Sequence, residues 1–467
     1  MPEAPDLSVP RHVHVVAAGG AGMSAIATVL AQSGHTVTGS DAADGAALRR
    51  LEDLGVRVRV GHSAAAVEGA DLVVVSTAVA ADNPEVVAAR AAGIPVLNRR
   101  ELLPAFAARQ PFLSVAGTHG KTTTSSMLAV ALDRAGEAPS FLVGAEVAAL
   151  GASAGFRSGR HMVLEADESD ATFLAGPRAG ALVTNLEPDH LEFWGGWDEL
   201  RAGFVEFLEG TDGPCIVCAD DAGSAALVDA VSVPVTTYGT AAGATHRVVD
   251  LELTADGSSF RLEGPAGGVG VGLVVPGLHN ALNAAGALAL AVEIGVDPAA
   301  AAAGLGEHTG VARRFEHRGR TDGITFVDDY AHLPTEVCAA LAAGRSGGWG
   351  RVVAVFQPHR YSRTEALGTE FGTCFADADV LVLTDIYAAG EAPRDGVTGR
   401  VVLDAAVAAG PDRDVRWAGT LDEVADLLAD ELRPGDLCLS VGAGDVTRVA
   451  DMVQERLVAR PAGGGAQ

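Results

Sequence analysis

Short apolar runs alternate with helix-like segments along most of the chain, and this alternation limits the possible folds more than any other feature of the sequence. In the first hundred residues, strand-length apolar runs and segments of helical periodicity follow one another at 12–17, 22–33, 36–39, 71–76, 84–92 and 94–97. Strands that alternate with helices form parallel βαβ units. The sequence therefore predicts an α/β fold built on mostly parallel sheets.

The same pattern restarts twice, which divides the chain into blocks. A new apolar run and a Gly-rich turn begin at about residue 111, and a third block opens with the run 324–328. At roughly 150 residues per domain, a chain of this length provides about three domains. We therefore expect domains at 1–107, 108–320 and 321–467.

The two later blocks contain further elements. Residues 235–275 show β-type alternation, and the Ala-rich stretch 283–304 has helical periodicity with a break at 295–298. Beyond residue 324 we expect strands at 352–356, 380–383 and 437–441. A last helix is expected at 445–458, and a frayed tail at 461–467.

The charge balance excludes several classes of function. Lys and Arg number 33 against 60 Asp and Glu, which gives a formal net charge of -27. Such a chain is a poor candidate for coating nucleic acid or for binding an anionic membrane surface. It has no apolar run of about 18 residues, so we expect no membrane span. Five dispersed cysteines and an N-terminus unlike a secretory signal suggest the cytoplasm.

A single lysine stands among the 33 basic residues: Lys121, within the segment AGTHGKTTT at 116–124. This Gly-rich loop follows a predicted strand and opens a helix, which directs backbone N–H groups at phosphates. Lys121 can place its ammonium between the β- and γ-phosphates, and Thr122 can offer a hydroxyl to Mg²⁺. Val115 replaces the first Gly of the eight-residue P-loop pattern, so the loop is a shorter GxxGKTT form. The planar guanidinium of arginine could not copy this role.

Two acidic segments follow later strands of the same block. Residues 165–170 read EADESD, and residues 184–190 read TNLEPDH. Both lie where a strand ends, and the carboxyl edge of a parallel sheet is where ligands bind. Carboxylates suit Mg²⁺, and a neutral histidine can join them. A solvated acidic loop with a capping aspartate is the simpler alternative, but the preceding phosphate loop favours a metal site.

Taken together, the motifs resemble the Mur ligase family of peptidoglycan synthesis over about residues 12–450. The matching segments are AGGAGMSAIA (18–27), GSD (39–41), STAV (76–79), NPE (83–85), AGTHGKTTT (116–124), EADESDATF (165–173), TNLEPDH (184–190), PGLHNALNA (276–284), GVARRFE (310–316), DDYAHLPTE (328–336), FQPHRYSR (356–363), DIYAAGE (385–391) and VGAGD (441–445).

The resemblance implies a fold and a reaction. It implies a Rossmann-like UDP-binding domain, a central P-loop ATPase domain and a C-terminal Rossmann-like domain. The implied reaction joins L-alanine to UDP-N-acetylmuramate with ATP, through an acyl phosphate, and gives UDP-N-acetylmuramoyl-L-alanine, ADP and phosphate. Attachment of a whole tripeptide to the same sugar nucleotide is the alternative. ATP and Mg²⁺, with two ions, are the implied cofactors, and the chain would be a monomer or a homodimer.

The resemblance also assigns roles to residues. Catalytic roles are implied for Lys121, Glu165, His190 and Arg314, and metal ligation for Thr122, Glu165 and His190. The implied ATP contacts are Gly117, Thr118, His119, Gly120, Lys121, Thr122, Thr123, His279, Asn280, Asn283, Arg314 and Asp328. The implied UDP-sugar contacts are Gly19, Gly20, Ala21, Gly22, Met23, Ser24, Asp41, His62 and Ser76. Substrate carboxylates and the amino acid would face Tyr330, His332, His359 and Arg360.

The sequence departs from the family pattern at three positions. Ala17 stands where a glycine is usual, and an alanine is tolerated there only if its φ stays negative. Leu333 replaces a second histidine beside His332, and His308 replaces a phenylalanine. The CxxC pair at 215–218 lies in a strand-like run with no second pair nearby, so we expect a packed strand there instead of a zinc or redox site.

Two other classes of protein stay open at this point. The Rossmann-like start and the glycine turn at 17–22 also fit an NAD-dependent oxidoreductase, although the phosphate loop and the acidic segments argue against it. A regulatory nucleotide-binding protein without catalysis is the second, and the presence of Lys121, Glu165 and His190 argues against that.

Overall fold

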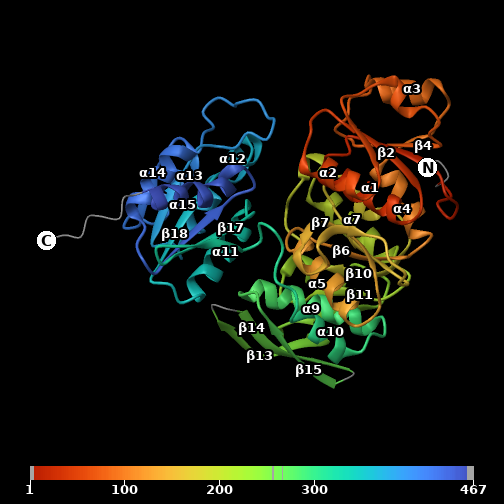
Figure 1. Cartoon of the computed structure of the whole chain (residues 1–467). Helices are drawn as coiled ribbons and strands as arrows, with labels where there is room; N and C mark the ends of the chain where they lie inside the picture. Colours follow the sequence, from red (N-terminus) through yellow and green to blue (C-terminus); the bar gives the residue numbers. More distant parts are fainter. Residues whose placement is uncertain (1–4, 255–256, 266, 460–467) are drawn as a thin grey trace. The chain divides into compact units, whose positions relative to one another are not determined.

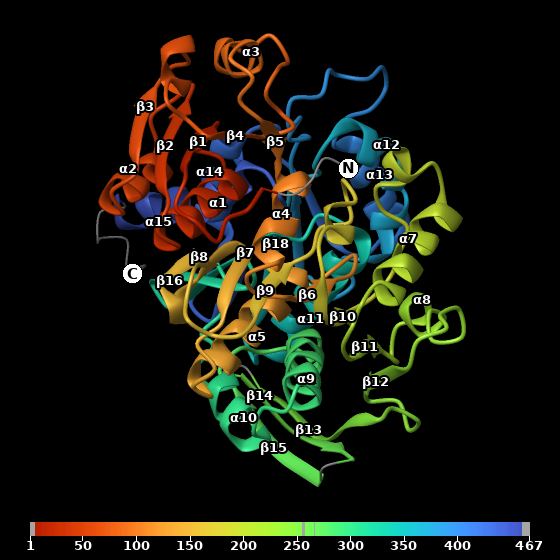
Figure 2. The same ribbon diagram turned by 90° about the vertical axis from the view of Figure 1, so that its right-hand side faces the viewer.

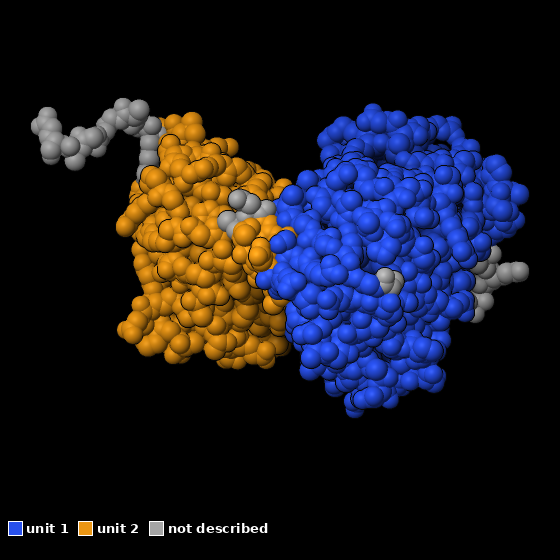
Figure 3. All heavy atoms as spheres, turned by 90° about the horizontal axis from the view of Figure 1, so that it is seen from below, with its two compact units in different colours: residues 1–251, 259–274, 280–309 blue, residues 252–258, 275–279, 310–467 orange. Residues whose placement is uncertain are grey.

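The computed structural model describes residues 5–254, 257–265 and 267–459 (Figure 1). The predicted tail at 461–467 lies outside the described residues. Three mostly parallel β-sheets follow one another along the chain, with five, ten and six strands. The predicted α/β class is therefore confirmed. The described residues form two compact units, coloured separately in Figure 3, and residues 310–459 make up most of the second.

The first sheet has the strand order β3-β2-β1-β4-β5, and every neighbouring pair is parallel. Asparagine caps begin its last two helices: Asn83 accepts from the N–H of Glu85, and Asn98 forms a capping box with Glu101. The elements of this region are β1 (His12–Val16), α1 (Ala21–Gln32), β2 (Thr36–Asp41), α2 (Ala46–Asp53), β3 (Arg57–Val60), β4 (Leu72–Val75), α3 (Pro84–Ala91), β5 (Val96–Asn98) and α4 (Arg99–Ala107).

The second sheet has the order β15-β14-β13-β12-β11-β10-β6-β9-β7-β8. Strand β6 is parallel to β9 on one side and to β10 on the other, and α5 follows it directly (Figure 2). The elements are β6 (Phe112–Ala116), α5 (Lys121–Arg134), β7 (Ser140–Val147), β8 (Ala152–Gly155), β9 (Met162–Glu165), β10 (Arg178–Val183), α6 (Leu191–Trp194), α7 (Trp197–Glu209), β11 (Cys215–Cys218), α8 (Ala222–Ala225), β12 (Val235–Gly239), β13 (His246–Thr254), β14 (Gly257–Gly264), β15 (Gly267–Leu273), α9 (Leu278–Glu293) and α10 (Pro298–Leu305).

Helix α1 joins the first two sheets into one compact unit. It packs on β1 and β2 of the first sheet and also on β7 and β8 of the second. The apolar core that contains Val15 and Ile26 continues without a break to Leu142 of β7 and Ala154 of β8. Because the same helix covers both sheets, the glycine turn that precedes it lies beside the second sheet.

The third sheet has the order β16-β17-β21-β18-β19-β20, and only the edge pair β16–β17 is antiparallel. Separate apolar clusters cover its two faces, one with α11 and α13 and the other with α14 and α15. The elements are β16 (Glu316–Thr321), β17 (Ile324–Asp329), α11 (Pro334–Ser346), β18 (Arg351–Phe356), α12 (Tyr361–Leu367), β19 (Val380–Leu383), α13 (Arg400–Ala409), β20 (Asp414–Trp417), α14 (Leu421–Glu431), β21 (Asp436–Val441) and α15 (Val449–Ala459).

Some element bounds differ from those expected. Strand β16 spans the expected boundary at 320/321, so we propose to place that boundary before Gly310, where the main segment of the second unit begins. Helix α9 starts at Leu278, earlier than expected, and the expected break before α10 is present. Cys215 and Cys218 are buried in β11, which confirms the packed strand. Among the described residues, we find no helix that is both long and apolar enough to cross a membrane.

Candidate functional site

The phosphate loop links β6 to α5 and depends on two glycines with positive φ. Gly117 has φ 133° and Gly120 has φ 76°, a region that side chains rarely adopt. A Cβ on Gly120 would also lie 2.7 Å from Oδ1 of Asn283, so α9 closes over the loop at this point. Asn283 and Asn280 are both buried. The structure thus places these two predicted ATP residues with the loop's own unit.

Lys121, the first residue of α5, is held by the loop and by one acid. Its Nζ donates to the carbonyl oxygens of Gly117, at 2.7 Å, and Thr118, at 3.2 Å. It also forms an ion pair with Glu168 at 2.9 Å. Glu168 is 2% exposed. Sequence reasoning named this acid only as part of an acidic segment, whereas the structure makes it the direct partner of the lysine.

The charges around this lysine compensate one another. Burial would lower the pKa of Lys121, but Glu168, Asp167 and Glu165 outweigh burial and raise it, so the ammonium is kept. Burial raises the pKa of Glu168 against the opposing charge of Lys121. For Asp167, burial acts in the raising direction, but Lys121, hydrogen bonds from Ser169 and the charge of Arg99 hold the pKa below its ordinary value.

Glu165 ends β9 and reaches the phosphate loop. Its carboxylate accepts a hydrogen bond of 2.8 Å from the Thr122 hydroxyl and another from the backbone N–H of Gly144. One carboxylate and one hydroxyl fit Mg²⁺, which keeps several waters and uses few protein ligands beside substrate phosphates. Across the described residues, no group of three or more His, Cys, Asp or Glu side chains is arranged to hold a metal ion.

The loop after β10 braces the phosphate loop from the other side. Asn185 Oδ1 accepts from the backbone N–H of His119 at 2.7 Å, and Thr184 Oγ1 donates to the His119 carbonyl at 2.6 Å. The His119 ring lies 3.0 Å from a Glu187 carboxylate oxygen. His190 follows with φ 53°, and its ring faces Asp189 at 3.4 Å.

These contacts bring the central-domain residues to a single edge of the second sheet. Strand β6 carries the phosphate loop, β9 ends at Glu165, and β10 leads into the loop of His190. The three strands are parallel and adjacent. We expected both acidic segments to follow strands at the sheet edge that carries the phosphate loop, and the strand order agrees with this.

A cavity of about 960 Å³ opens at the glycine turn of the first sheet. Most of the predicted UDP-sugar residues line it: Gly19, Gly20, Ala21, Gly22, Met23, Asp41 and Ser76. The backbone N–H of Gly19 donates to Asp41 at 2.9 Å. The volume lies within the usual range for sites that bind small molecules. Ala17 of the glycine turn and Asp170 of the first acidic segment also line the cavity. So do residues to which the sequence analysis assigned no role: Ala43, Asp44, Gly45, Thr77, Ala78, Asn98, Arg99, Arg100 and Phe193.

Ala17 does not meet the condition set for it by the sequence. Its φ is 59°, in the left-handed region that favours glycine. The turn nevertheless forms, because the Gly20 N–H donates to the Ala17 carbonyl and the Ala18 N–H donates to Ser40. The alanine therefore keeps the glycine-like geometry under strain.

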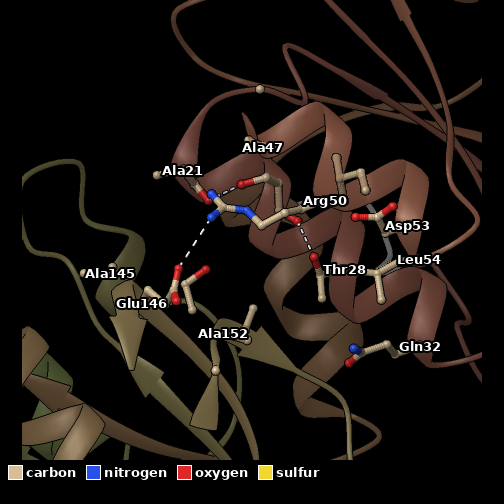
Figure 4. A pocket seen from close by; sticks show the side chains of 17 residues that line it. Ala21, Thr28, Gln32, Ala47, Arg50, Asp53, Leu54, Ala145, Glu146 and Ala152 are labelled. Atoms are coloured by element: carbon tan, nitrogen blue, oxygen red, sulfur yellow. Dashed lines mark hydrogen bonds and ion pairs between the residues drawn. The ribbon is translucent and has the colours of Figure 1, made fainter. Parts of the chain in front are cut away.

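Two of the predicted UDP-sugar residues do not line that cavity. Ser24 lines a second cavity of about 520 Å³, between α1 and α2 on one side and the β7–β8 region on the other (Figure 4). An ion pair of 3.4 Å between Arg50 and Glu146 spans it. His62 points instead to Glu85, with Nδ1 3.0 Å from the carboxylate.

Glu85 of α3 is fully buried and contacts two histidines, His14 of β1 and His62. Burial would raise its pKa, but the hydrogen bonds that it accepts from side chains and from the Ser63 backbone lower it to about 2. Ser40 Oγ donates to it at 2.5 Å, and His14 Nε2 lies at 3.6 Å. Glu85 belongs to the matched NPE segment, but no local sequence pattern indicates that it forms this cluster.

The remaining predicted residues belong to the second unit, where four rings form a row. The His332 ring packs edge-on against Tyr330 and His359, and His359 stacks on Tyr387 with centroids 5.8 Å apart. Burial lowers the pKa of His359 to about 4, with further lowering by His332 and nearby arginines. Arg360 follows with φ 70° and donates its backbone N–H to Tyr387. Tyr387 was not anticipated, although it lies in the matched DIYAAGE segment.

Other predicted residues of that unit have internal partners. Arg314 lies over the Tyr330 ring and 3.7 Å from Glu336. Asp328 is fully buried and accepts from Arg313 Nε at 3.1 Å and from the Thr447 hydroxyl at 2.8 Å. Burial raises the pKa of Asp328. These contacts hold β17 to the loop after β21, which is a structural role beside any contact with nucleotide.

The last two departures, Leu333 and His308, are buried, whereas His279 is half-buried. Leu333 is 5% exposed and is the residue directly before α11. His308 is fully buried, its Nε2 lies 2.7 Å from Ser126 Oγ on α5, and burial lowers its pKa to about 4. Burial, with the charge of Arg314, lowers the pKa of His279 to about 4 as well. Both rings are therefore neutral at pH 7.

Three family profiles match the chain in order along its length. "Mur ligase family, catalytic domain" matches residues 12–111, "Mur ligase middle domain" matches residues 115–291, and "Mur ligase, glutamate ligase domain" matches residues 313–444.

Curated relatives and solved structures agree with these profiles. A UDP-N-acetylmuramate--L-alanine ligase of Kineococcus radiotolerans is 47% identical over 460 residues, which is 96% of each chain. One of Paenarthrobacter aurescens is 45% identical over 95% of this chain and 97% of its own. The UDP-N-acetylmuramate-alanine ligase of Thermotoga maritima superposes with a TM-score of 0.80 at 28% identity, over 96% of this chain and 99% of its own. The chain belongs to the Mur ligase family.

Proposed function

We propose that this chain catalyses the ATP-dependent joining of L-alanine to UDP-N-acetylmuramate, a step of peptidoglycan precursor synthesis. The products are UDP-N-acetylmuramoyl-L-alanine, ADP and phosphate. The relatives that carry this activity by name match nearly the full length of the chain at 42–47% identity. ATP and nucleotide sugars are cytoplasmic metabolites, so we propose that the chain acts in the cytoplasm, as a monomer or a homodimer.

The proposal rests on one observation: two glycine loops of the kind that binds anions lie in the same compact unit. The phosphate loop ends at Lys121, while the glycine turn at 17–22 opens the cavity of about 960 Å³. Asp170, from the acidic segment of the second sheet, lines that same cavity. A sugar nucleotide bound at the first loop would therefore extend toward the acids that flank the second.

The reaction brings two anions together, and the residues of the loop meet that demand. The muramoyl carboxylate attacks the γ-phosphorus of ATP, so that the bond to the β–γ bridging oxygen breaks and ADP leaves. The alanine amine then attacks the acyl carbon and phosphate leaves. Lys121, kept charged by the surrounding acids, would stabilise the negative charge on the transferred phosphoryl group. Backbone N–H groups at the start of α5 would bind the neighbouring phosphates.

The oxygen ligands at this edge fit Mg²⁺. We propose that Glu165 and Thr122, which are 2.8 Å apart, hold one ion, with His190 near a second. A bound Mg²⁺ would screen the charge of the phosphates and of the incoming carboxylate. The chain's own contribution is to fix Glu165 through Gly144 and Thr122 before substrate arrives.

The residues of the second unit would serve the amino acid and the nucleotide. We propose that Tyr330, His332, His359 and Arg360 bind the substrate carboxylates and the incoming alanine. The row of aromatic rings supports this proposal, because its imidazoles are neutral and can accept or donate single hydrogen bonds without adding charge. Arg314, Asp328 and His279 are proposed to act on the ATP side, as are Asn280 and Asn283 of the first unit.

Phosphate release tests the proposal. Purified protein is incubated with ATP and Mg²⁺, and UDP-N-acetylmuramate and L-alanine are added singly and together. We expect turnover only when both are present, with a product heavier than the sugar nucleotide by one alanine residue. Replacing L-alanine with a tripeptide tests the alternative. Turnover with the tripeptide and none with L-alanine would contradict the proposed acceptor.

A further inference from the structure

Arg99, the first residue of α4, stands between two cavities. It lines the cavity of about 960 Å³ at the glycine turn and also a smaller one of about 210 Å³. The smaller cavity is also lined by Glu165 and Asp167, the acids beside the phosphate loop. Ala21 and Gly22 are the other residues that both cavities share. Arg99 therefore lies where the sugar-nucleotide cavity leads toward the ATP side.

The position of this guanidinium is unfavourable for its own helix. A positive charge at the N-terminus of a helix opposes the helix dipole, and Arg100 repeats the cost at the next position. Asn98 and Glu101 already supply a complete capping box, so α4 does not need either arginine to begin. A residue that is unfavourable for its own helix, and that does not stabilise the fold in another way, is a candidate for a functional role.

Arg99 also lacks a partner that would explain it. Within the described part of the chain, its guanidinium forms no hydrogen bond or ion pair, although acids outnumber bases by 60 to 33. Its charge acts on Asp167 only as a minor cause of that residue's lowered pKa. Arg99 is half-buried and lines the cavity, so its donors are available to a ligand there.

The donors of Arg99 converge with those of α1. Its Nη1 lies 3.6 Å from the place that a Cβ on Gly22 would occupy. Gly22 lies in the first turn of α1, whose free N–H groups favour an anion. An oxyanion at this point would be bound by backbone N–H groups on one side and by a planar guanidinium on the other.

We propose that Arg99 binds the phosphate of the sugar nucleotide that is attached to the sugar. This contact holds the diphosphate at the boundary of the two cavities, so that the muramoyl group enters the smaller cavity with its carboxylate directed at Glu165. The inference rests on the proposed function, because it requires a nucleotide diphosphate sugar as substrate. It adds a substrate-binding residue on α4, an element outside the glycine turn.

Binding measurements with two nucleotide sugars test this. Calorimetry gives the Kd of UDP-N-acetylmuramate and of UDP-N-acetylglucosamine, which has the same diphosphate but no lactyl carboxylate. We expect Arg99→Gln to weaken both by a similar factor, about ten- to a hundredfold, the change that follows loss of a charged hydrogen bond. Arg99→Lys should retain part of the affinity, because the charge stays while the fork geometry is lost. The Kd of ATP should not change.

Arg57→Gln is the matched control. Arg57 is an exposed arginine of the same domain, on β3, and it lines neither cavity. The control should bind both nucleotide sugars as the unaltered chain does, and thermal unfolding checks that each variant is folded.

The possible results separate the inference from the proposed function. If Arg99→Gln weakens only UDP-N-acetylmuramate, the arginine binds the carboxylate and the phosphate contact is overturned. If it weakens neither sugar nucleotide, the inference fails while the ligase function stands. If the unaltered chain binds neither sugar nucleotide and does not turn over, the proposed function itself fails.

Discussion

The two glycine loops of the first compact unit share one construction, a strand, a glycine turn and a helix, but they obtain their cations differently. The phosphate loop carries its own, since Lys121 is the first residue of α5 and is paired with Glu168 at 2.9 Å. The turn before α1 has no basic residue of its own. Arg99 of α4 stands beside it, without an ion-pair partner among the described residues.

The difference reflects what each loop has to do. A lysine buried with acids keeps a compact charge in a fixed place, which suits phosphoryl transfer, where charge develops at one point. An unpaired arginine on a neighbouring helix offers a planar fork to a ligand that only has to be held. A cation within a motif can be found from sequence, whereas one that is contributed from elsewhere needs the fold.

The first prediction tests the cation of the phosphate loop, where we expect the largest effect. Lys121→Arg keeps the net charge but replaces a point-like ammonium with a wider fork. We expect the fold to remain and the rate of ADP release to fall by at least about 10²-fold, the scale for removing a preorganised charge contact. Turnover near that of the unaltered chain would make the lone lysine an accident of composition. Arg57→Lys, the reverse exchange at an exposed site, serves as the control.

The second prediction concerns the buried acid of each region. Glu168 is paired with a lysine, whereas Glu85 is held by serine and histidine groups that lower its pKa from 4.5 to about 2. A lowered pKa stabilises the fold above pH 4.5, and this contribution is lost as the pH falls toward 2. Between pH 5 and pH 3 the loss should be about 2 kcal/mol.

Denaturant unfolding at these two pH values measures that loss. Glu85→Gln should lower the free energy of unfolding at pH 5 but reduce its further fall on acidification. Glu68→Gln, at an exposed site before β4, is the control and should keep the full pH dependence. An unchanged acid dependence in Glu85→Gln would mean that the cluster does not set stability.

The third prediction compares a glycine from each loop. Gly120→Ala would force a side chain into a positive φ and against Asn283, so we expect about a tenfold or greater loss in kcat/KM for ATP. Gly20 has a negative φ, and a Cβ added there by Gly20→Ala would meet a single atom within 4 Å, the Ala17 carbonyl oxygen at 3.5 Å. It should change ATP use little. Equal effects of the two alanines would show that the loops are not constrained differently.

The smallest expected effect is at Ala17. Ala17→Gly should stabilise the chain by less than about 1 kcal/mol, because relief of the positive φ is partly offset by greater freedom of the unfolded chain. Ala88→Gly, in the interior of α3, should instead destabilise it by about 1 kcal/mol. Calorimetric melting temperatures of both variants provide the measurement, and a loss of stability in Ala17→Gly would remove the evidence of strain.

Features that depend on a local sequence pattern could be predicted, whereas features that depend on long-range contacts could not. The phosphate loop follows from a strand, glycines and a lysine within nine residues, and its placement beside Glu165 follows from the rule that ligands gather at strand ends. Glu168 could be found only as one of four clustered acids, because its pairing depends on how the chain turns after β9. Glu85 and His62 lie 23 positions apart, and their contact arises because α3 packs against the segment that follows β3.

The backbone of Ala17 shows the other limit. Sequence reasoning required a negative φ for alanine, but the surrounding hydrogen bonds from Gly20 and Ala18 hold the turn in its glycine-like form. Tertiary contacts can impose a strained conformation that local preference disfavours. The same holds for Asp328, whose partners Arg313 and Thr447 are brought together only by the third sheet.

The shared position of α1 has a consequence for how such chains can recombine. Because the core around Ile26 extends to Leu142 and Ala154, one helix surface is shaped by two sheets at once. A chimaera that takes only residues 1–107 from a relative would set a foreign helix face against the native β7–β8 hairpin. Functional exchange of the nucleotide-sugar module therefore requires a crossover point after β8, well inside what the sequence marks as the next domain.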